Sequence, residues 1–515
     1  MVSRLIDLQL IKGSYFRGLS DGNRIRRVVI HAPRGKILAR GGEILVGNKE
    51  VNVEITFDRT LGFIKKEVQD PSAQNSVVES KRFYPLGPKF AHAGGYVGEV
   101  NEEELGKIKG ECPQKGARKN GDTIGRTGLE KQYDCALFGM NGELLFEVDA
   151  SNKTAQVLGK KDAIPGDDVR TTIDFDLQMK VSELMENQKG AVVVSGLNGE
   201  ILAFFSGPSF DPNLFVSGNP TQLSQVLTNP DLLLFNRVIG GVFHPGSVYK
   251  PLVGLAALEE KVIDENYTYQ DQGQIVIKNL YGTFSYKNWY FTQYGGVEGN
   301  IGLERALARS TDTFFYQIGE LLGAEKISEW SEKFGLSKET GIDIPGEISG
   351  LVPNPDWKIE RKGERWFLGD TYNVSIGQGD LVVTPIAINT MIAAIADSGK
   401  LCSPHFLQTD KTDCTVIDLE NSNQKEVRLG MEDACKTGGT AFPFFDFYEK
   451  RSVKVACKTG TAQNVNEDPH AWFVAFAPSE KPEIFLTVLV ENGGEGSKVA
   501  APIAKEIMDY YFASR

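Results

Sequence analysis

The sequence predicts an α+β protein of two domains, and three observations point to this fold class. The chain has 515 residues, more than one compact domain usually holds. Hydrophobic residues make up 41% and charged residues 24%, which is ordinary for a protein with a large buried core. From about residue 166, strands come first, a block of helices follows, and strands with a closing helix return. This order is typical of an antiparallel sheet packed with helices.

The first 165 residues predict a β-rich N-terminal pedestal or dimerisation-type domain with one or two helices. Residues 28–38 and 43–56 alternate apolar and polar side chains around the turn Arg40-Gly-Gly-Glu43. A polar hinge at 159–168 then separates domain 1–165 from domain 166–515.

The second domain is expected to contain the catalytic sheet and its helices. Residues 171–178 lead into a helix, and strands follow at 190–195 and 199–205. The remaining elements are helices near 247–260, 300–322, 325–334 and 383–397, strands near 452–458, 470–477 and 483–491, and a helix at 500–512.

Charge and cysteine usage exclude several function classes. The net charge of −12 argues against a nucleic-acid partner. The cysteines form no Cys-x-x-Cys and the five histidines are scattered, so neither a metal site nor another cofactor is expected. The six cysteines fall in neighbouring couples that either form local disulfides or stay free, which spacing leaves open: Cys112/Cys135, Cys402/Cys414 and Cys435/Cys457.

The segment Gly246-Ser247-Val-Tyr-Lys250-Pro251 predicts a nucleophile at a helix N-terminus. Apolar residues recur at helical spacing after it, and Pro251 is tolerated only in the first turn. A partly desolvated lysine one turn along can take the serine proton. Taken alone, an N-capping serine followed by a surface lysine explains most such patterns. A second match, Ser422 to Lys425, lies in a polar stretch without helical periodicity and is attributed to chance.

Two further motifs follow in the chain. Ser310-Thr-Asp312 precedes an apolar-rich segment, and Lys458-Thr-Gly-Thr461 closes the alternating strand 452–457. On that strand Lys458 and Gly460 share a face, and a glycine there would allow a substrate backbone to approach closely. A similar tripeptide, Lys436-Thr-Gly438, lacks a β-branched lead-in and is discounted.

In this order, with Ser310 63 residues after Ser247 and Lys458 148 residues after Ser310, the motifs resemble the triplet of penicillin-recognising serine enzymes. Nearly the whole chain resembles class B penicillin-binding proteins, and in particular the elongation-type, penicillin-binding protein 2-like members. The segments that carry this resemblance are 30–40, 125–133, 199–203, 209–212, 310–317, 366–371, 376–379 and 470–478.

The resemblance implies a penicillin-binding transpeptidase fold and a peptidoglycan D,D-transpeptidase that needs no cofactor. It implies that Ser247 attacks the penultimate D-alanine of a stem peptide, with Lys250 as base and with Ser310 and Lys458 relaying the proton. Thr459 and Thr461 would hold the donor carboxylate, and the backbone N–H groups of Ser247 and Thr461 would form the oxyanion hole. Asp312 and Gly460 complete the expected substrate site.

The expected partners are stem peptides, β-lactams, a membrane glycan polymerase and scaffold proteins of the elongation machinery. No window approaches the length of a membrane span, and the start lacks a signal-peptide layout. In the family, the segment resembling residues 4–11 directly follows a transmembrane helix. We therefore expect the complete protein to be single-pass, with its catalytic domain outside the cytoplasm.

Two departures from the family pattern affect the site and the linker. Asp312 stands where many relatives have asparagine, and its charge would raise the pKa of Lys250 and Lys458. Ala39 and Gly41 replace the usual Asp and Asn of the linker turn.

Two other functions share part of these features. A scaffold with a vestigial site is disfavoured by intact Ser247, Lys250, Ser310 and Lys458. A β-lactamase or β-lactam sensor is disfavoured by the large N-terminal domain and by the lack of an obvious deacylating carboxylate.

Overall fold

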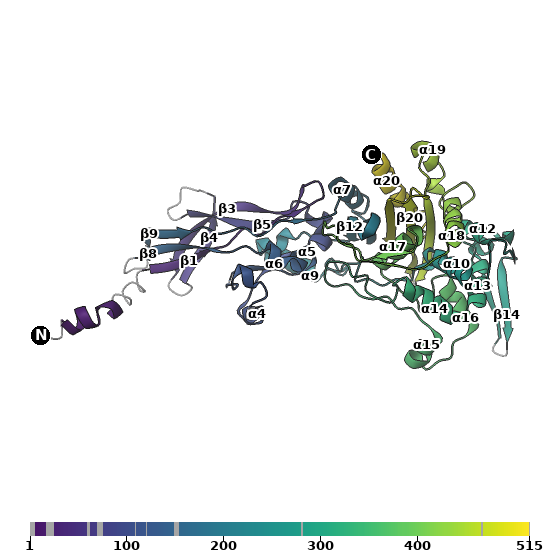
Figure 1. Ribbon diagram of the computed structural model, residues 1–515, viewed down its shortest axis with the longest axis horizontal. Helices are drawn as coiled ribbons and strands as arrows, with labels where there is room; N and C mark the ends of the chain where they lie inside the picture. The colour runs from purple at the N-terminus through teal and green to yellow at the C-terminus, as the bar shows by residue number, and fades with distance from the viewer. Residues whose placement is uncertain are drawn as a thin grey trace.

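The computed structural model describes residues 6–16, 25–58, 62–69, 76–108, 110–119, 121–148, 154–279, 282–464 and 467–513. The molecule is elongated, with a β-rich N-terminal part and a larger C-terminal part that contains most of the helices (Figure 1). Arg4 and Leu5 of the predicted membrane-proximal segment lie outside the described residues. Among the described residues no helix has the length and apolarity needed to cross a bilayer.

The two larger sheets of the N-terminal part have three and five strands. One has the order β1 (Ile25–Ile30), β8 (Gly142–Val148), β9 (Thr154–Lys161). The other has the order β10 (Val169–Arg170), β2 (Ile37–Leu38), β3 (Ile44–Asp58), β4 (Gly62–Val68), with β5 (Ser76–Phe83) also paired to β3. The predicted turn is present, since Ala39 N–H donates to Glu43 O at 2.8 Å. The single strand expected at 28–38 is instead two strands, β1 and β2, in different sheets.

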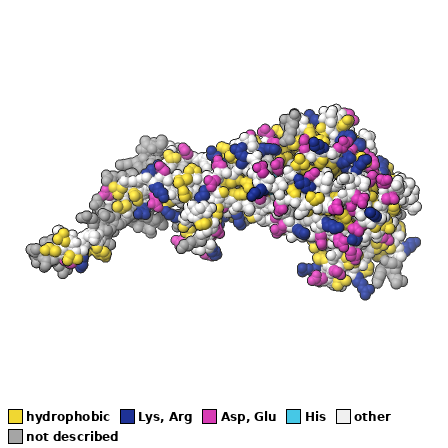
Figure 2. Space-filling model, viewed as in Figure 1, with side chains coloured by type: hydrophobic (Ala, Val, Ile, Leu, Met, Phe, Trp, Pro, Cys, Tyr) yellow, Lys and Arg dark blue, Asp and Glu magenta, His cyan; other side chains and the backbone are white. Residues whose placement is uncertain are grey.

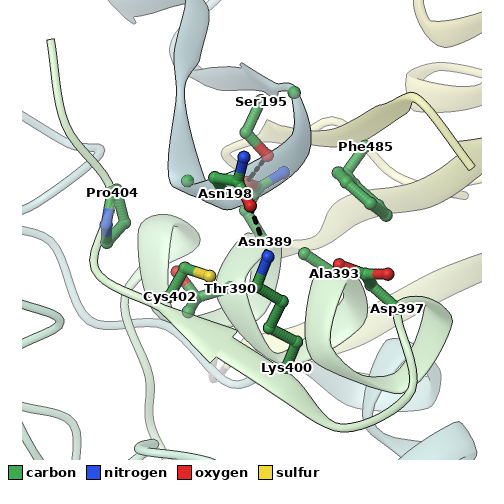
Figure 3. Close-up of a pocket in the computed structure, with 12 residues that line it drawn as sticks. Ser195, Asn198, Asn389, Thr390, Ala393, Asp397, Lys400, Cys402, Pro404 and Phe485 are labelled. Atoms are coloured by element: carbon green, nitrogen blue, oxygen red, sulfur yellow. Dashed lines mark hydrogen bonds between the residues drawn. The ribbon is translucent and has the colours of Figure 1, made fainter. Parts of the chain in front are cut away.

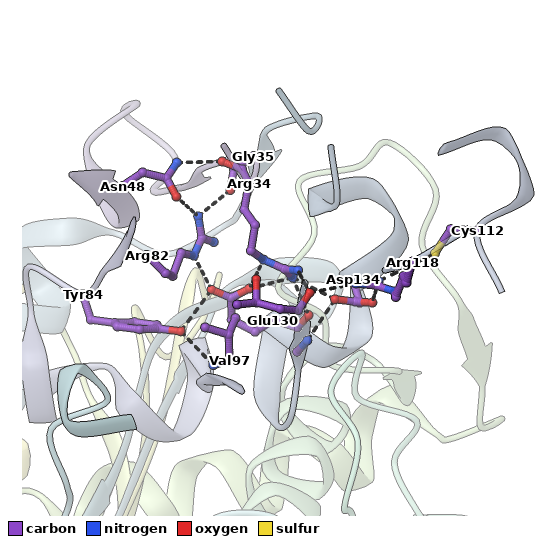
Figure 4. A network of polar contacts seen from close by, with 12 residues as sticks. Arg34, Gly35, Asn48, Arg82, Tyr84, Val97, Cys112, Arg118, Glu130 and Asp134 are labelled. Carbon is purple, nitrogen blue, oxygen red and sulfur yellow. Dashed lines mark hydrogen bonds and ion pairs between the residues drawn. The ribbon is translucent and has the colours of Figure 1, made fainter. Parts of the chain in front are cut away.

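Short elements complete the N-terminal part. They are β6 (Val97–Glu99), β7 (Thr123–Gly125), α3 (Ala91–Gly94), α4 (Glu102–Lys107), α5 (Gly128–Gln132) and α6 (Asp134–Leu137). A buried ion network around Glu130 holds α5 and α6 against β5 and the 31–36 segment (Figure 4). Burial opposes ionisation of Glu130, but the charges of Arg82 and Arg34 outweigh it and lower its pKa. Each Glu130 carboxylate oxygen has a guanidinium partner, whereas Arg82 Nη2 has no hydrogen-bond partner among the described residues.

The C-terminal part is built on a five-stranded antiparallel sheet, which confirms the predicted α+β class. Its order is β12 (Ile201–Gly207), β11 (Gly190–Ser195), β21 (Ile484–Val490), β20 (Glu467–Ala477), β19 (Ala456–Asn464). Both faces are covered: α7 (Phe175–Leu184) and α20 (Ala500–Ala513) pack on one, and α17 (Pro385–Ala396) packs on the other. In the described part of the chain β19 pairs with β20 alone, so it is an edge strand.

A helical block lies beside β19. It includes α10 (Lys250–Glu259), α12 (Leu303–Arg309), α13 (Asp312–Leu322), α14 (Ala324–Lys333), α16 (Leu368–Ser375) and α18 (Asn421–Ala434). An excursion from this block contains β13 (Tyr269–Asp271), the hairpin β14 (Gln274–Asn279) and β15 (Gly282–Lys287), α11 (Trp289–Tyr294) and β16 (Gly299–Ile301). Peripheral elements are α8 (Asn213–Ser217), α9 (Pro220–Leu227), α15 (Pro355–Lys362), β17 (Lys400–Cys402), β18 (Cys414–Val416) and α19 (Phe447–Arg451).

Three local predictions in the C-terminal part were wrong. The helix expected at 300–322 is split into α12 and α13 at Ser310, where the backbone is left-handed. The strand expected at 452–458 is β19 and begins only at Ala456, because α19 and a left-handed Ser452 lie before it. Ser422 to Lys425 lies in a helix, α18, although both of these side chains are exposed.

All six cysteines are paired within the neighbouring couples. The bonds are Cys112–Cys135, Cys402–Cys414 and Cys435–Cys457. The last one joins the C-terminal end of α18 to β19, at the residue before Lys458. The N-terminal end of β19 is thus covalently linked to the helical block.

Candidate active site

Ser247 lies in a tight helical turn that leads into α10. The turn is a 3₁₀ helix, Gly246–Tyr249, and Lys250 begins α10 with Pro251 in its first turn. Residues three apart eclipse one another in a 3₁₀ helix, so the Ser247 and Lys250 positions share one side of the turn. The predicted helix start is confirmed, with a tighter first turn than an α-helix would give.

Glycines fix the entry to this turn. Gly246 has φ of +56° and donates its N–H to Gly377 O at 2.8 Å. A Cβ at Gly377 would lie 2.2 Å from Gly246 O, so no other residue fits there without moving the turn. Gly377 belongs to the segment 376–379, one of the segments that carry the family resemblance. It allows the nucleophile turn to pack closely against this segment.

Lys250 is fully buried and has three oxygen acceptors. Its Nζ donates to Asp312 Oδ1 at 2.7 Å, to Ser310 O at 2.9 Å and to Ser310 Oγ at 3.2 Å. The Phe315 ring lies beneath the ammonium, 5.2 Å from Nζ to the ring centroid. The first two motifs therefore meet directly at Lys250.

Ser310 is placed by the break between two helices. Its φ of +57° is left-handed, and this conformation lets the chain leave α12 and start α13 two residues later. A non-glycine residue in this region costs about 1 kcal/mol or more and is common at functional sites. The break brings the Ser310 hydroxyl and the Asp312 carboxylate to the same amine.

Asp312 is held from the opposite side by the start of α11. Its Oδ2 accepts the Trp289 backbone N–H at 3.1 Å, and its own N–H donates to Asn288 Oδ1 at 3.2 Å. Asn288 is wholly buried. Sequence reasoning missed both residues, because nothing in their local pattern marks a contact with a motif 23 or 24 residues away.

Lys458 and Gly460 lie inside β19, not at its end. Lys458 is fully buried, and the partner of its Nζ within the described chain is Thr459 O at 3.1 Å. A Cβ at Gly460 would lie 2.9 Å from both Val248 Cγ1 and Trp472 Cβ, and 3.2 Å from Pro245 O. The residues in this close contact include those of the protein's own nucleophile turn. The need for glycine at position 460 is therefore explained by internal packing and not by the predicted approach of a substrate.

The two threonines of the third motif differ in exposure. Thr459 is buried, and its Oγ1 lies 2.8 Å from Oγ1 of Thr440, in the loop after α18. Thr461 is exposed on the edge strand, and its Oγ1 accepts the Gly496 N–H at 3.2 Å. Thr461 O also lies against the turn, since a Cβ at Gly246 would be 3.1 Å from it.

Burial controls the charge of the two lysines. It lowers the pKa of Lys250, and this effect exceeds the opposing one of Asp312. Burial and the positive charge of Lys250 together hold the pKa of Lys458 well below its ordinary value, with Asp312 opposing. Asp312 therefore acts on the pKa in the predicted direction, but desolvation is the larger effect.

One small cavity of the described structure lies away from this site. It is lined by Ser195, Asn389, Lys400 and neighbouring residues, and none of the predicted site residues takes part in it (Figure 3). Within the described ranges, no three His, Cys, Asp or Glu side chains are grouped as metal ligands would be. Positive and negative side chains are intermixed on the visible face of the C-terminal part (Figure 2).

Comparisons with known proteins identify the family of this chain. Residues 189–509 match the family described as the penicillin binding protein transpeptidase domain, and residues 58–171 match the penicillin-binding protein dimerisation domain. The chain is 30% identical to the peptidoglycan D,D-transpeptidase MrdA of Acinetobacter baumannii, over 100% of this chain and 85% of the relative.

Two solved structures have the same overall fold. One is penicillin-binding protein 2 of Helicobacter pylori in complex with MreC, with a TM-score of 0.79, 28% identity, and coverage of 95% of this chain and 98% of that chain. The other is a chain from a peptidoglycan synthase complex that coordinates polymerization and crosslinking. It has a TM-score of 0.80, 26% identity, and coverage of 99% of this chain and 96% of that chain.

Proposed function

The chain belongs to the penicillin-binding protein transpeptidase family, and we propose that Ser247 is its acylated nucleophile in peptidoglycan cross-linking. The observation that carries this proposal is that the first two motifs meet at one buried amine, while Gly460 of the third motif packs against the nucleophile turn. Lys250 is one helical turn from Ser247, bonds Ser310 and Asp312, and lies close enough to Lys458 to lower the pKa of that lysine.

The acylation step follows from these groups. Ser247 Oγ adds to the carbonyl carbon of the penultimate D-alanine while Lys250 takes the hydroxyl proton. Ser310 and Lys458 pass a proton to the leaving nitrogen, the C–N bond breaks, and terminal D-alanine departs. An amine from a second stem peptide then attacks the ester, forming the cross-link and restoring Ser247.

The edge strand supplies the donor site. Among the described residues, no strand pairs with the free side of β19, so an extended peptide can pair with the backbone groups there. The backbone N–H groups of Ser247 and Thr461 stabilise the oxyanion. The hydroxyls of Thr459 and Thr461 bind the terminal carboxylate, and a β-lactam acylates the same serine as a donor mimic.

Partners and location follow from the substrate. Stem peptides lie outside the cytoplasm, and three disulfides suit an oxidising compartment. We place the catalytic domain on that side of the cell membrane, with the boundary between the two domains near residue 165. A scaffold protein and a glycan-polymerising protein are the proposed partners, by likeness to the two solved assemblies.

A fluorescent penicillin tests the nucleophile. We expect one label per molecule of the parent protein and no label in Ser247→Ala. The adduct should be hydrolysed far more slowly than it forms. Ser422→Ala is the matched control, because it removes the serine of the other Ser-x-x-Lys at an exposed position. Retained labelling in Ser247→Ala would refute the assignment, and rapid loss of the adduct would indicate a β-lactamase.

A further inference from the structure

The excursion from β13 to β16 holds the start of α13 at two points. The first is Asp271, which is buried and accepts the Thr313 hydroxyl at 2.7 Å and the backbone N–H groups of Gly273 and Glu298, each at 2.8 Å. The second is Asn288, whose N–H donates to Gly273 O at 2.8 Å and whose Oδ1 accepts the Asp312 N–H. The excursion thus fixes two consecutive residues of α13, and one of them is Asp312.

Each carboxylate oxygen of Asp312 faces a hydrogen-bond donor. Lys250 Nζ lies 2.7 Å from Oδ1 and the Trp289 N–H lies 3.1 Å from Oδ2. A carboxylate accepts at both positions, whereas an asparagine amide would turn its NH₂ towards one of these two donors. The side chain of Asp312 is only 14% exposed, so water offers little relief.

We propose that the Asn288–Trp289 turn positions Asp312 and makes position 312 selective for a carboxylate. Asn288 fixes the backbone of Asp312, and the Trp289 N–H occupies the second oxygen. This arrangement holds the negatively charged carboxylate of Asp312 against the Lys250 amine. It thereby sets the pH at which Lys250 can act as a base. The inference rests on the proposed acylation of Ser247.

The charged and titratable groups around this contact are few among the described residues. Asp312 approaches Lys250 from α13 and Lys458 approaches it from β19. Burial raises the pKa of Tyr316, one turn further along α13, and the charges of Asp312 and Tyr286 add to this rise. A change at Asp312 therefore acts first on Lys250.

Proline substitution can remove the single N–H. Trp289 is the first residue of α11, where proline is tolerated, and Asn288 has φ −72° and ψ 143°, which suit a residue before proline. Trp289→Pro and Trp289→Ala both remove the indole, and with it the bond from its Nε1 to Arg309 O, but only the proline removes the N–H. The pair of variants isolates that donor.

The first experiment measures acylation rates with a fluorescent penicillin. We expect Asp312→Asn to slow acylation by about tenfold or more in the Trp289→Ala background, and by much less in the Trp289→Pro background. Equal slowing in the two backgrounds would overturn the selectivity argument. Absence of any Ser247-dependent label in the parent would instead refute the proposed function.

The second experiment measures the acylation rate against pH. Asp312 raises the pKa of Lys250, so Asp312→Asn should move the acidic limb of the pH–rate profile to lower pH. Asn288→Ala should move it in the same direction but less far, and the double variant should match Asp312→Asn alone.

The control for Asn288 is Asn389→Ala. Asn389 is also a buried asparagine, and it bonds Ser195 and Thr487 away from the predicted site residues. The Asn389→Ala variant should have a lower melting temperature and an unchanged acidic limb in its pH–rate profile. Rates are divided by the fraction of enzyme that is labelled at saturation, so misfolded protein does not affect the limb. If Asn288→Ala left the acidic limb of the pH–rate profile unchanged, Asn288 would have only a structural role and the proposed positioning of Asp312 would be refuted.

Discussion

Lys250 and Lys458 are both buried, yet their surroundings differ. Lys250 has three oxygen acceptors, one of them a carboxylate, whereas the partner of Lys458 Nζ in the described structure is a single backbone carbonyl. A buried ammonium is stable only when paired, so the ammonium that Lys250 becomes when it takes the Ser247 proton is better stabilised than an ammonium at Lys458. A proton taken from Ser247 is therefore held better at Lys250 than at Lys458 before it passes to the leaving group.

Gly460→Ala tests how closely β19 contacts the nucleophile turn. The added methyl would overlap Val248 and Trp472, neither of which can move without shifting Ser247 or the sheet. We expect a loss of about 1–3 kcal/mol in the free energy of unfolding and a clear fall in acylation rate. Thermal melts and penicillin labelling measure both quantities. Gly106→Ala, in an open position on α4, is the control and should be neutral or slightly stabilising.

At the scale of elements, the site depends on how α12, α18 and β19 are joined. Gly430 lets α18 approach α12 closely, since a Cβ there would lie 2.8 Å from Leu307 Cβ. The bond Cys435–Cys457 then ties the end of α18 to β19. The helix that ends at Ser310 and the strand that contains Lys458 are consequently braced through the same helix.

Glu304→Gln should change the pH dependence of stability at this contact. A hydrogen bond with Asp433, together with burial, raises the pKa of Glu304 to about 7 from its ordinary 4.5, with Glu426 adding to the rise and Lys436 opposing it. Between these values the unfolded chain loses a proton that the folded protein keeps, so stability falls as pH rises from 4.5 to 7. Glutamine keeps a donor for Asp433 and removes that loss.

The expected result is a higher melting temperature for Glu304→Gln above pH 7 and none of this gain below pH 4.5. Because Glu304 is only half-buried, solvent screening keeps the gain below about 1 kcal/mol. Glu103→Gln, on an exposed turn of α4, is the control. A difference in melting temperature between the parent and Glu304→Gln that does not change with pH would contradict a proton held between Glu304 and Asp433.

At the scale of the whole molecule, the two parts meet through specific polar contacts as well as through apolar packing. Tyr133 OH, from the N-terminal part, donates to Asp343 Oδ2 at 2.6 Å, and the same carboxylate accepts the N–H groups of Phe406 and Leu407. β10 pairs with β2, so the chain enters the C-terminal part from a sheet of the N-terminal part. These contacts favour a defined orientation between the nucleophile and the pedestal.

Tyr133→Phe should weaken this junction without affecting the chemistry. The variant loses one hydrogen bond to a carboxylate, which costs about 1–3 kcal/mol, while Asp343 keeps its backbone donors. We expect a lower melting temperature and an unchanged acylation rate per labelled enzyme. Tyr448→Phe, at a position that is 57% exposed, is the control. An unchanged melting temperature would show that the contact adds nothing to domain docking.

The sequence by itself determined the α+β class, most sheet strands and the three motifs, because these depend on periodicity and on residue order. Hydrophobic alternation and a proline in a first helical turn are local properties, so they located Ser247 at a helix start. The same locality explains the errors: a left-handed Ser310 and the start of β19 depend on packing that no single segment contains.

Only the tertiary structure decided what surrounds the motifs. It paired the cysteines, assigned Gly460 to packing against Val248 and Trp472, and brought the Asn288–Trp289 turn to Asp312. It also settled the balance at Lys250, where burial outweighs the charge of Asp312. The physical reason is common to all of these: desolvation and close contact depend on three-dimensional surroundings, which residues distant in the chain create together.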